Sequence, residues 1–242
     1  MSRPAEQLPM AASSAPVEAP QGLDFSTVLA NSIHDMKNSL GVVLGMLDEV
    51  AEVSEGAAGE QLQMVRYEGR RVNHHLVQLL AIYRMHHHGY HASLDEHVVA
   101  DFLEELGQTN AGMLRSRDIE LQIDCDPDLV GFFDRDLIAS VLNNVVNNAY
   151  RYTREQLCLR GEERDGELVL TVADDGDGYP PHMQVAAGTR PGDLNMGAGS
   201  AGLGLYFAAQ VAALHRHRGR GGQIRCDNEG INGGGRFSIL IP

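Results

Sequence analysis

The sequence predicts an α+β fold in which a hairpin of two long helices precedes a sheet covered by helices on one face. Two observations support this prediction. Apolar residues recur at helical spacing along two early segments, and beyond about residue 95 the pattern changes to short strands and helices separated by turns. We expect a disordered tail at residues 1–22, the helical hairpin at 23–92 and the mixed domain at 93–242.

The hairpin is predicted from two apolar seams. The first runs through Phe25, Leu29, Ile33, Met36, Leu40, Val43, Leu47 and Val50, and the second, after a break at 56–59, through Leu62, Val65, Gly69, Val72, Leu76, Leu79 and Tyr83. A short connection between two such helices favours an antiparallel pair. Because two helices bury little apolar surface, pairing with a second copy into a four-helix bundle is expected, and the chain should be a homodimer.

The mixed domain is predicted from the order of its periodic segments. We expect helices near 97–115 and 134–151, strands near 119–125, 155–163 and 167–173, a glycine-rich stretch at 176–204 leading to a helix that ends near residue 215, and strands near 223–227 and 236–241. Helices and strands that alternate in this way are typical of a sheet with helices packed on one face.

Composition excludes several classes of protein. The formal charge of −14 disfavours binding to nucleic acid, which depends on clustered Lys and Arg. No apolar stretch reaches the length of a membrane span, and the start of the chain does not resemble a secretory signal. The three cysteines, Cys125, Cys158 and Cys226, are widely spaced, which fits a reducing cytoplasm.

One histidine lies beside the first apolar seam. His34 follows the seam residue Ile33, so its imidazole should be accessible to solvent. A neutral imidazole is a competent nucleophile toward phosphorus, and Asp35 can orient it or accept its proton. Asn38 lies one helical turn further on, where its amide could orient a water. The alternatives are an ordinary surface histidine and an asparagine that only solvates the helix.

The predicted helix at 134–151 carries four asparagines in a short run. Asn144 and Asn148 are four residues apart and share one helical face. Amide oxygens suit Mg²⁺, which keeps waters and substrate phosphates in its coordination shell. Asparagine has a low helix propensity, so four asparagines are unexpected in a helix with only a structural role. A purely structural helix remains the alternative.

Two glycine-containing segments could shape a ligand site. Asp174 ends a strand that runs into the turn at Gly176 and Gly178, where a buried carboxylate could accept a hydrogen bond from an adenine amino group. The run 197–205 leads into an apolar helix, whose N-terminus could face phosphates. A plain acidic turn and a flexible glycine loop are the alternatives.

Taken in order, the histidine run, the asparagine helix, the Asp-x-Gly-x-Gly turn and the Gly-Leu-Gly-Leu segment resemble the motifs of bacterial two-component sensor histidine kinases, over about residues 24–242. The resemblance implies a dimerisation and phosphotransfer hairpin followed by an α/β-sandwich ATPase domain of the GHKL type. It implies ATP and Mg²⁺ as ligands. The site residues that it implies are His34 as phosphoacceptor, Asp35, Asn38, Asn144, Asn148 as magnesium ligand, Arg151, Tyr152, Asp174, Gly176, Gly178, Gly202, Leu203 and Gly204.

The implied function is autophosphorylation of His34 and transfer of the phosphoryl group to an aspartate of a response regulator. An upstream signalling protein is expected as a further partner, because few residues precede the hairpin. Two rival functions stay open. One is an ATP-independent phosphotransferase or regulator-binding scaffold, and the other is an ATPase clamp of the same superfamily without phosphohistidine chemistry.

The sequence departs from the family pattern in three places. Ser39 stands where many relatives have proline, Ser200 replaces a frequent glycine, and no clear Phe-containing motif lies between Gly178 and Gly202. The basic stretch 215–220 is interpreted as a solvated loop. A metal site at His86, His87, His88 and His91 is less favoured than a polar end to the second helix.

Overall fold

The computed structural model describes residues 25–53, 57–87, 91–186, 189 and 200–242. Its elements, in chain order, are α1 (Phe25–Val53), α2 (Ala57–His87), β1 (Asp95–Val98), α3 (Val99–Arg115), β2 (Glu120–Cys125), β3 (Val130–Phe133), α4 (Arg135–Tyr152), β4 (Gln156–Arg164), β5 (Glu167–Asp174), α5 (Ser200–Leu214), β6 (Arg216–His217), β7 (Arg220–Gly221), β8 (Gln223–Asp227) and β9 (Arg236–Ile241). Short 3₁₀ helices span Pro181–Met183 and Ile231–Gly233.

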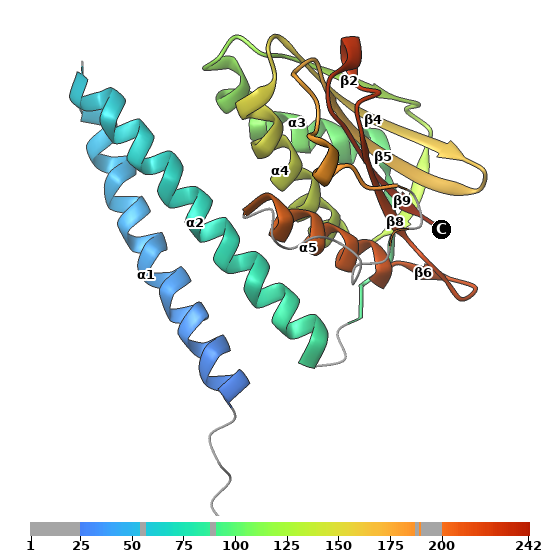
Figure 1. Ribbon diagram of the computed structural model, residues 1–242, viewed down its shortest axis with the longest axis horizontal. Helices are drawn as coiled ribbons and strands as arrows, with labels where there is room; N and C mark the ends of the chain where they lie inside the picture. The colour runs from blue at the N-terminus through green and yellow to red at the C-terminus, as the bar shows by residue number, and fades with distance from the viewer. Residues whose placement is uncertain (1–24, 54–56, 88–90, 187–188, 190–199) are drawn as a thin grey trace, which may run out of the picture.

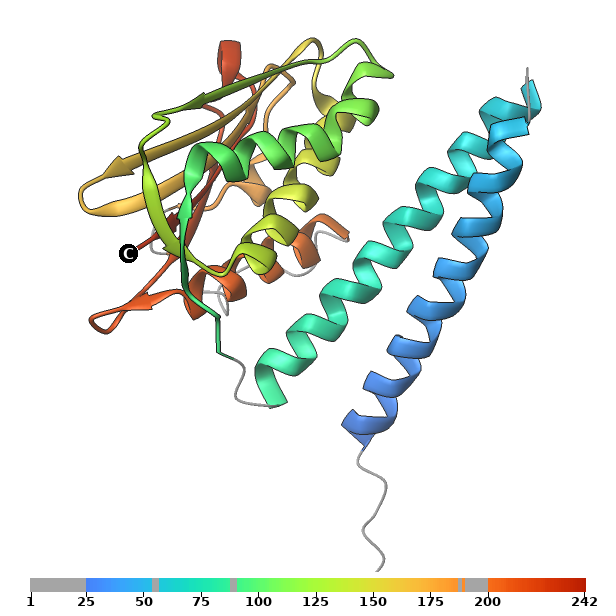
Figure 2. The ribbon, with the colours of Figure 1, turned by 180° about the vertical axis from the view of Figure 1, so that it is seen from behind.

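A five-stranded sheet of order β2-β4-β5-β9-β8 organises the C-terminal part of the chain. β2 runs parallel to β4, and the other neighbours are antiparallel. Helices α3, α4 and α5 lie on one side of this sheet (Figure 1, Figure 2). Alternate residues of β5, namely Leu168, Leu170 and Val172, join the core between sheet and helices. The expected mixed α/β layer is therefore confirmed.

The structure adds strands that the sequence did not indicate. β1 pairs with β3 in a separate two-stranded ribbon, and β6 pairs with β7 in a short hairpin. Residues 97 and 98, which were assigned to a helix, belong to β1. These strands are only two to four residues long. Such short segments show too few alternations to be recognised from sequence.

Helices α1 and α2 lie side by side along their length (Figure 1). Their contact includes Gly69, where an added Cβ would come within 2.7 Å of Leu44 Cδ2, so glycine permits the close approach. Ile33 and Leu44 are buried, whereas the seam residues Met36 and Val43 are 58% and 49% exposed. The first seam is therefore only partly covered within one chain. Pairing with a second copy stays a prediction.

The basic stretch that was interpreted as a solvated loop is a hairpin anchored by a buried histidine. His215 is 1% exposed, and its Nε2 accepts a hydrogen bond from the backbone N–H of Asp134 at 3.0 Å. Its Nδ1 donates to the Val211 carbonyl at 2.8 Å. The solvated-loop interpretation was wrong for His215, because polar neighbours in the sequence concealed a side chain that lies in the core.

Asp134 connects this histidine to two other parts of the chain. Its Oδ1 accepts from the N–H of Leu137 at 3.0 Å, which caps the N-terminus of α4. Its Oδ2 accepts from the N–H of Ser93 at 2.9 Å. The segment that follows α2, the start of α4 and the end of α5 are thus held by one network of hydrogen bonds.

Within the described ranges, no helix combines the length and apolar character that a membrane span requires.

We predict that His215→Ala destabilises the protein by about 2 kcal/mol at pH 7.5, because it leaves a buried N–H of Asp134 without an acceptor. Burial lowers the pKa of His215, although the Val211 carbonyl and Asp134 oppose this. The stability that the neutral imidazole contributes is full above the unfolded-state pKa of about 6.5 and is lost as the pH falls through the lower folded-state pKa. The difference between wild type and variant should therefore shrink toward pH 5.

Denaturant unfolding of the full chain between pH 5 and 8 measures this difference. His217→Ala is the matched control, because His217 is exposed on the same hairpin. A stability difference that stays constant across this pH range would contradict a neutral, buried His215.

Candidate functional site

A buried carboxylate at the end of β5 forms the centre of the candidate site. Asp174 is 7% exposed, and its Oδ1 accepts hydrogen bonds from the backbone N–H groups of Gly176 at 2.8 Å and Gly235 at 3.2 Å. Burial raises the pKa of the Asp174 carboxyl, while the two N–H donors act in the opposite direction. Both of these hydrogen bonds use Oδ1, so Oδ2 can face a hydrogen-bond donor on a ligand.

Glycines enclose this carboxylate so closely that side chains would collide with it. A Cβ at Gly176 would lie 2.9 Å from Asp174 Oδ1, and one at Gly235 would lie 2.8 Å from Oδ2. A Cβ at Gly234 would come within 2.1 Å of the Asp174 carbonyl oxygen. Sequence reasoning missed the loop 230–235. The run Gly233-Gly234-Gly235 directly before the last strand was the signal that could have identified it.

The turn after Asp174 is fixed by a second carboxylate and by an amide. Asp175 accepts hydrogen bonds from the backbone N–H groups of Arg154 and Glu155 at 2.9 and 3.1 Å. Burial is the largest single effect on the pKa of Asp175 and raises it, but the backbone hydrogen bonds together outweigh burial, so the pKa is lowered. Asn228 bonds both the N–H and the carbonyl of Tyr179, at 2.6 and 3.1 Å. The adjacent Asp174 is therefore the carboxylate left to contact a ligand.

Gly178 lies at a position that requires glycine for two reasons, a positive φ and a lack of space for a Cβ. Its φ is +78°, and a Cβ there would lie 2.6 Å from the Asn228 side chain. The ring of Tyr179 approaches the same place, since its Cε2 would lie 3.2 Å from a Cβ at Gly235. Burial raises the pKa of Tyr179 well above its ordinary value. This aromatic wall beside Asp174 was also missed by sequence reasoning.

The asparagine helix and the second glycine motif meet in space. Asn144 on α4 is 6% exposed, and a Cβ at Gly204 would lie 2.5 Å from its Nδ2. Gly202, Leu203 and Gly204 belong to the first turns of α5 rather than to a loop, so the expected end of the glycine-rich stretch was placed too late. Glycine within this helix lets α5 approach the Asn144 side chain.

The other predicted residues of α4 point to solvent. Asn148, one turn after Asn144, is exposed, as are Arg151 and Tyr152 near the end of the helix. An exposed amide oxygen beside a ligand pocket fits the preference of Mg²⁺ for oxygen ligands and retained waters. The lid positions at 197–199 and the side chain of Ser200 lie outside the described residues, as do the side chains of His86, His87 and His88.

The predicted phosphoacceptor lies on α1, away from these elements in the sequence. The side chain of His34 is 48% exposed, with its Nδ1 3.8 Å from Asp35 Oδ1. Asn38 Nδ2 lies 3.2 Å from the same Nδ1. Two polar neighbours therefore converge on one ring nitrogen. The site residues thus form two groups, one on α1 and one on α4, β5 and α5.

Comparison with known proteins assigns the second group to a family. Residues 133–242 match the model described as histidine kinase-, DNA gyrase B- and HSP90-like ATPase. This region, called the ATPase region below, is therefore similar to that family. It contains α4, the Asp174 turn and the glycines of α5, so the second group of site residues lies entirely within it.

The whole chain resembles bacterial two-component sensor histidine kinases. It is 25% identical over 229 residues to the sensor protein SrrB of Staphylococcus aureus, a match that covers 88% of this chain and 37% of SrrB. The chain thus spans little more than a third of this relative.

Solved structures share the fold. Full-length ShkA in complex with AMPPNP superposes with a TM-score of 0.63 at 21% identity, covering 90% of this chain and 46% of ShkA. The Acinetobacter baumannii histidine kinase AdeS gives 0.55 at 17% identity, covering 86% of this chain and 96% of AdeS. Both similarities extend over the hairpin and the ATPase region, and they concern the fold alone.

We predict that Asp174→Asn lowers ATP affinity at least about tenfold, which corresponds to about 1.4 kcal/mol. The amide oxygen can keep the bonds from Gly176 and Gly235, but the NH₂ group then faces the adenine amino group donor to donor. Calorimetry with ATP measures the change. Asp177→Asn is the control because Asp177 is exposed in the same turn, and equal losses in the two variants would contradict an adenine-binding role for Asp174.

Proposed function

We propose that the chain is a histidine kinase that phosphorylates its own His34 from Mg-ATP and transfers the phosphoryl group to an aspartate of a response regulator. The observation that carries this proposal is the environment of His34. An exposed imidazole has Asp35 and Asn38 at Nδ1, while no protein partner at Nε2 is found among the described residues. The ATPase region of the same chain supplies a nucleotide pocket.

The geometry at His34 defines a chemical step. When Nδ1 carries the proton, Nε2 has a free lone pair and can attack the γ-phosphorus of ATP. The bond between this phosphorus and the bridging oxygen breaks, ADP leaves with the electron pair, and Asp35 can accept the Nδ1 proton. The Asn38 amide can be turned so that Oδ1 accepts from Nδ1–H, since the two amide orientations are interchangeable. Both neighbours would then favour the reactive tautomer.

Each predicted residue of the ATPase region has a separate role in this proposal. Asp174 would recognise the adenine amino group, and Asn148 would hold Mg²⁺ with the buried Asn144 beside it. Arg151 and Tyr152 would face the phosphates from the end of α4. The metal supplies charge neutralisation of the phosphates when it is bound.

A homodimer would cover the apolar side chains that the hairpin leaves exposed. A hollow between α1 and α2 is lined by Leu40, Val43, Leu44, Leu47, Val65, Glu68, Gly69 and Val72. Several of its apolar side chains are open, with Val43, Val65 and Val72 between 46% and 55% exposed. Burying such a stripe against the same stripe of a second copy would produce a four-helix bundle with two phosphoacceptor sites.

Two other functions remain as rivals to the proposal. A regulator-binding scaffold would keep the hairpin but would not use ATP, and the enclosed Asp174 counts against it. An ATPase clamp would use ATP without forming phosphohistidine. Within the proposed scheme, the partners are a receiver domain, a second copy and an upstream signalling protein, and the compartment is the cytoplasm.

We predict that His34→Gln abolishes autophosphorylation and leaves ATP affinity within about twofold of wild type, because the nucleophile lies on α1 and the pocket on α4, β5 and α5. Incubation with γ-labelled ATP, followed by a test for acid-labile and base-stable label, measures the first effect. Calorimetry measures the second. His75→Gln on α2 is the control, and acid-labile label retained by His34→Gln would exclude this phosphoacceptor.

We further predict that the protein dephosphorylates its regulator and that Asn38→Ala loses most of this activity while still autophosphorylating. Asn38 lies one turn from His34, and an amide there can orient water for in-line attack on an acyl phosphate. The assay follows phosphate release from a phosphorylated receiver domain that this protein itself can phosphorylate. Ser39→Ala is the neighbouring control. Equal decay with wild type and Asn38→Ala would remove the role from this residue.

A further inference from the structure

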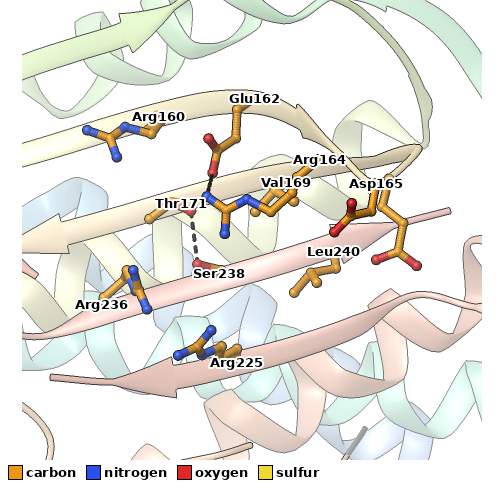
Figure 3. Close-up of a pocket in the computed structure, with 11 residues that line it drawn as sticks. Arg160, Glu162, Arg164, Asp165, Val169, Thr171, Arg225, Arg236, Ser238 and Leu240 are labelled. Carbon is orange, nitrogen blue, oxygen red and sulfur yellow. Dashed lines mark hydrogen bonds and ion pairs between the residues drawn. The ribbon is translucent and has the colours of Figure 1, made fainter. Parts of the chain in front are cut away.

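The face of the sheet opposite the helices contains a hollow of about 100 Å³ (Figure 3). It is a different place from the candidate nucleotide site. Thr171 and Asp174 lie on the same strand, three residues apart, so their side chains point to opposite faces of the sheet. Thr171 lines the hollow, whereas Asp174 does not and lies on the face of β5 that is covered by the helices.

Two hydroxyl groups form the floor of this hollow. Thr171 on β5 and Ser238 on β9 are opposite each other, and their oxygens lie 2.9 Å apart. Both residues are largely buried, at 7% and 6% exposed. One hydroxyl proton is used in the bond between them. The other proton finds no acceptor among the hydrogen bonds of the described residues, so an oxygen atom of a ligand above the pair would satisfy it.

Arginines stand on both sides of the hydroxyl pair. The strand register places Arg160, Thr171, Ser238 and Arg225 in one row across four neighbouring strands. With neighbouring strands about 4.8 Å apart, each guanidinium is within reach of the space above the hydroxyls. Arg236 comes two residues before Ser238 on the same face of β9, and it also lines the hollow (Figure 3).

Carboxylates outside the hollow hold these arginines in place. Asp124 Oδ2 accepts from Arg160 Nε at 2.8 Å, and Asp227 accepts from Arg236 Nε and Nη2 at 2.9 Å each. Asp227 also lies 2.6 Å from Arg225 Nε. Glu229 also pairs with Arg225 and Arg236, and none of these three carboxylates lines the hollow. Because a guanidinium has five N–H donors, each arginine keeps donors for another acceptor after these contacts.

Three acidic residues line the hollow: Glu162 lies on β4 near Thr171, whereas Asp165 and Glu167 lie at the β4–β5 turn. Glu162 pairs with Arg164, and Glu167 pairs with Arg220 at 2.6 Å. Figure 3 shows Asp165 beside the β4–β5 turn, on the far side of the hollow from Arg160 and Arg236. An anion above Thr171 and Ser238 would face the guanidinium groups of Arg160, Arg225 and Arg236, while the Glu162 carboxylate near Thr171 is already paired with Arg164.

We propose that this hollow binds a phosphate-type oxyanion, either free phosphate or a phosphomonoester, between Arg160, Arg225 and Arg236 and above the Thr171–Ser238 pair. Guanidinium groups match the geometry of tetrahedral oxyanions, and the unused hydroxyl proton adds a donor from below. The proposal is independent of the function proposed for His34 and Asp174. It assigns a second ligand site to the ATPase region.

An NMR titration tests this site on the full chain with the nucleotide pocket saturated by Mg-ADP, so that phosphate cannot report on that pocket. Inorganic phosphate and glycerol 3-phosphate are added in separate titrations, and sodium chloride at matched ionic strength is the blank. The arginine Nε–H signals of Arg160 and Arg225 should shift saturably with phosphate and not with chloride. Tighter binding of glycerol 3-phosphate identifies a phosphomonoester ligand, and equal or weaker binding identifies free phosphate.

The double variant Thr171→Val/Ser238→Ala should weaken this affinity at least tenfold. It removes both partners of one hydrogen bond together, so the fold should be retained. Arg225→Gln should weaken the affinity similarly. Arg135→Gln is matched in charge and lies on the helical side, paired with Glu105, and it should have no effect. Shifts no larger than those with chloride, or equal affinity in the wild type and the double variant, would overturn the proposal.

Discussion

The burial of one carboxylate constrains the architecture of the ATPase region more than any other feature. Taking Asp174 out of water is unfavourable unless donors surround it, and the backbone N–H groups of Gly176 and Gly235 are those donors. Two loops from distant parts of the sequence must therefore converge on the end of β5. Only glycine permits that approach, since a Cβ at Gly234 would overlap the Asp174 carbonyl. β9, which begins directly after Gly235, pairs with β5 and so holds this loop beside Asp174.

Sequence periodicity predicted the long elements because each repeats its pattern several times. α3, α4, β4, β5, β8 and β9 lie close to where the spacing placed them. The asparagine run predicted only that Asn144 and Asn148 share one helical face. Asn144 is buried against Gly204 and Asn148 is exposed, a distinction that depends on how α5 crosses α4 and so could not be read from α4 alone.

Features that depend on contacts between distant segments were missed. His215 is flanked by arginines and histidine in the sequence, and its burial is set by the N–H of Asp134, which lies 81 residues earlier. The glycines at 230–235 have a role only because Asp174 lies against them. The open sheet face illustrates the same limit, since Thr171 and Ser238 are 67 residues apart and meet only through strand pairing. No pattern within a short stretch of sequence predicts such contacts between distant residues.

The position of α2 has an evolutionary consequence. In both views α2 stands between α1 and the ATPase region, and its Ala81, Ile82 and Met85 pack against the core of that region (Figure 1, Figure 2). The side chains of α1 that surround His34 therefore do not share a packing surface with the enclosure of Asp174. Substitutions on the outer face of α1 can accumulate without repacking the pocket. The residues around His34 and those around Asp174 can accordingly diverge at independent rates within one lineage.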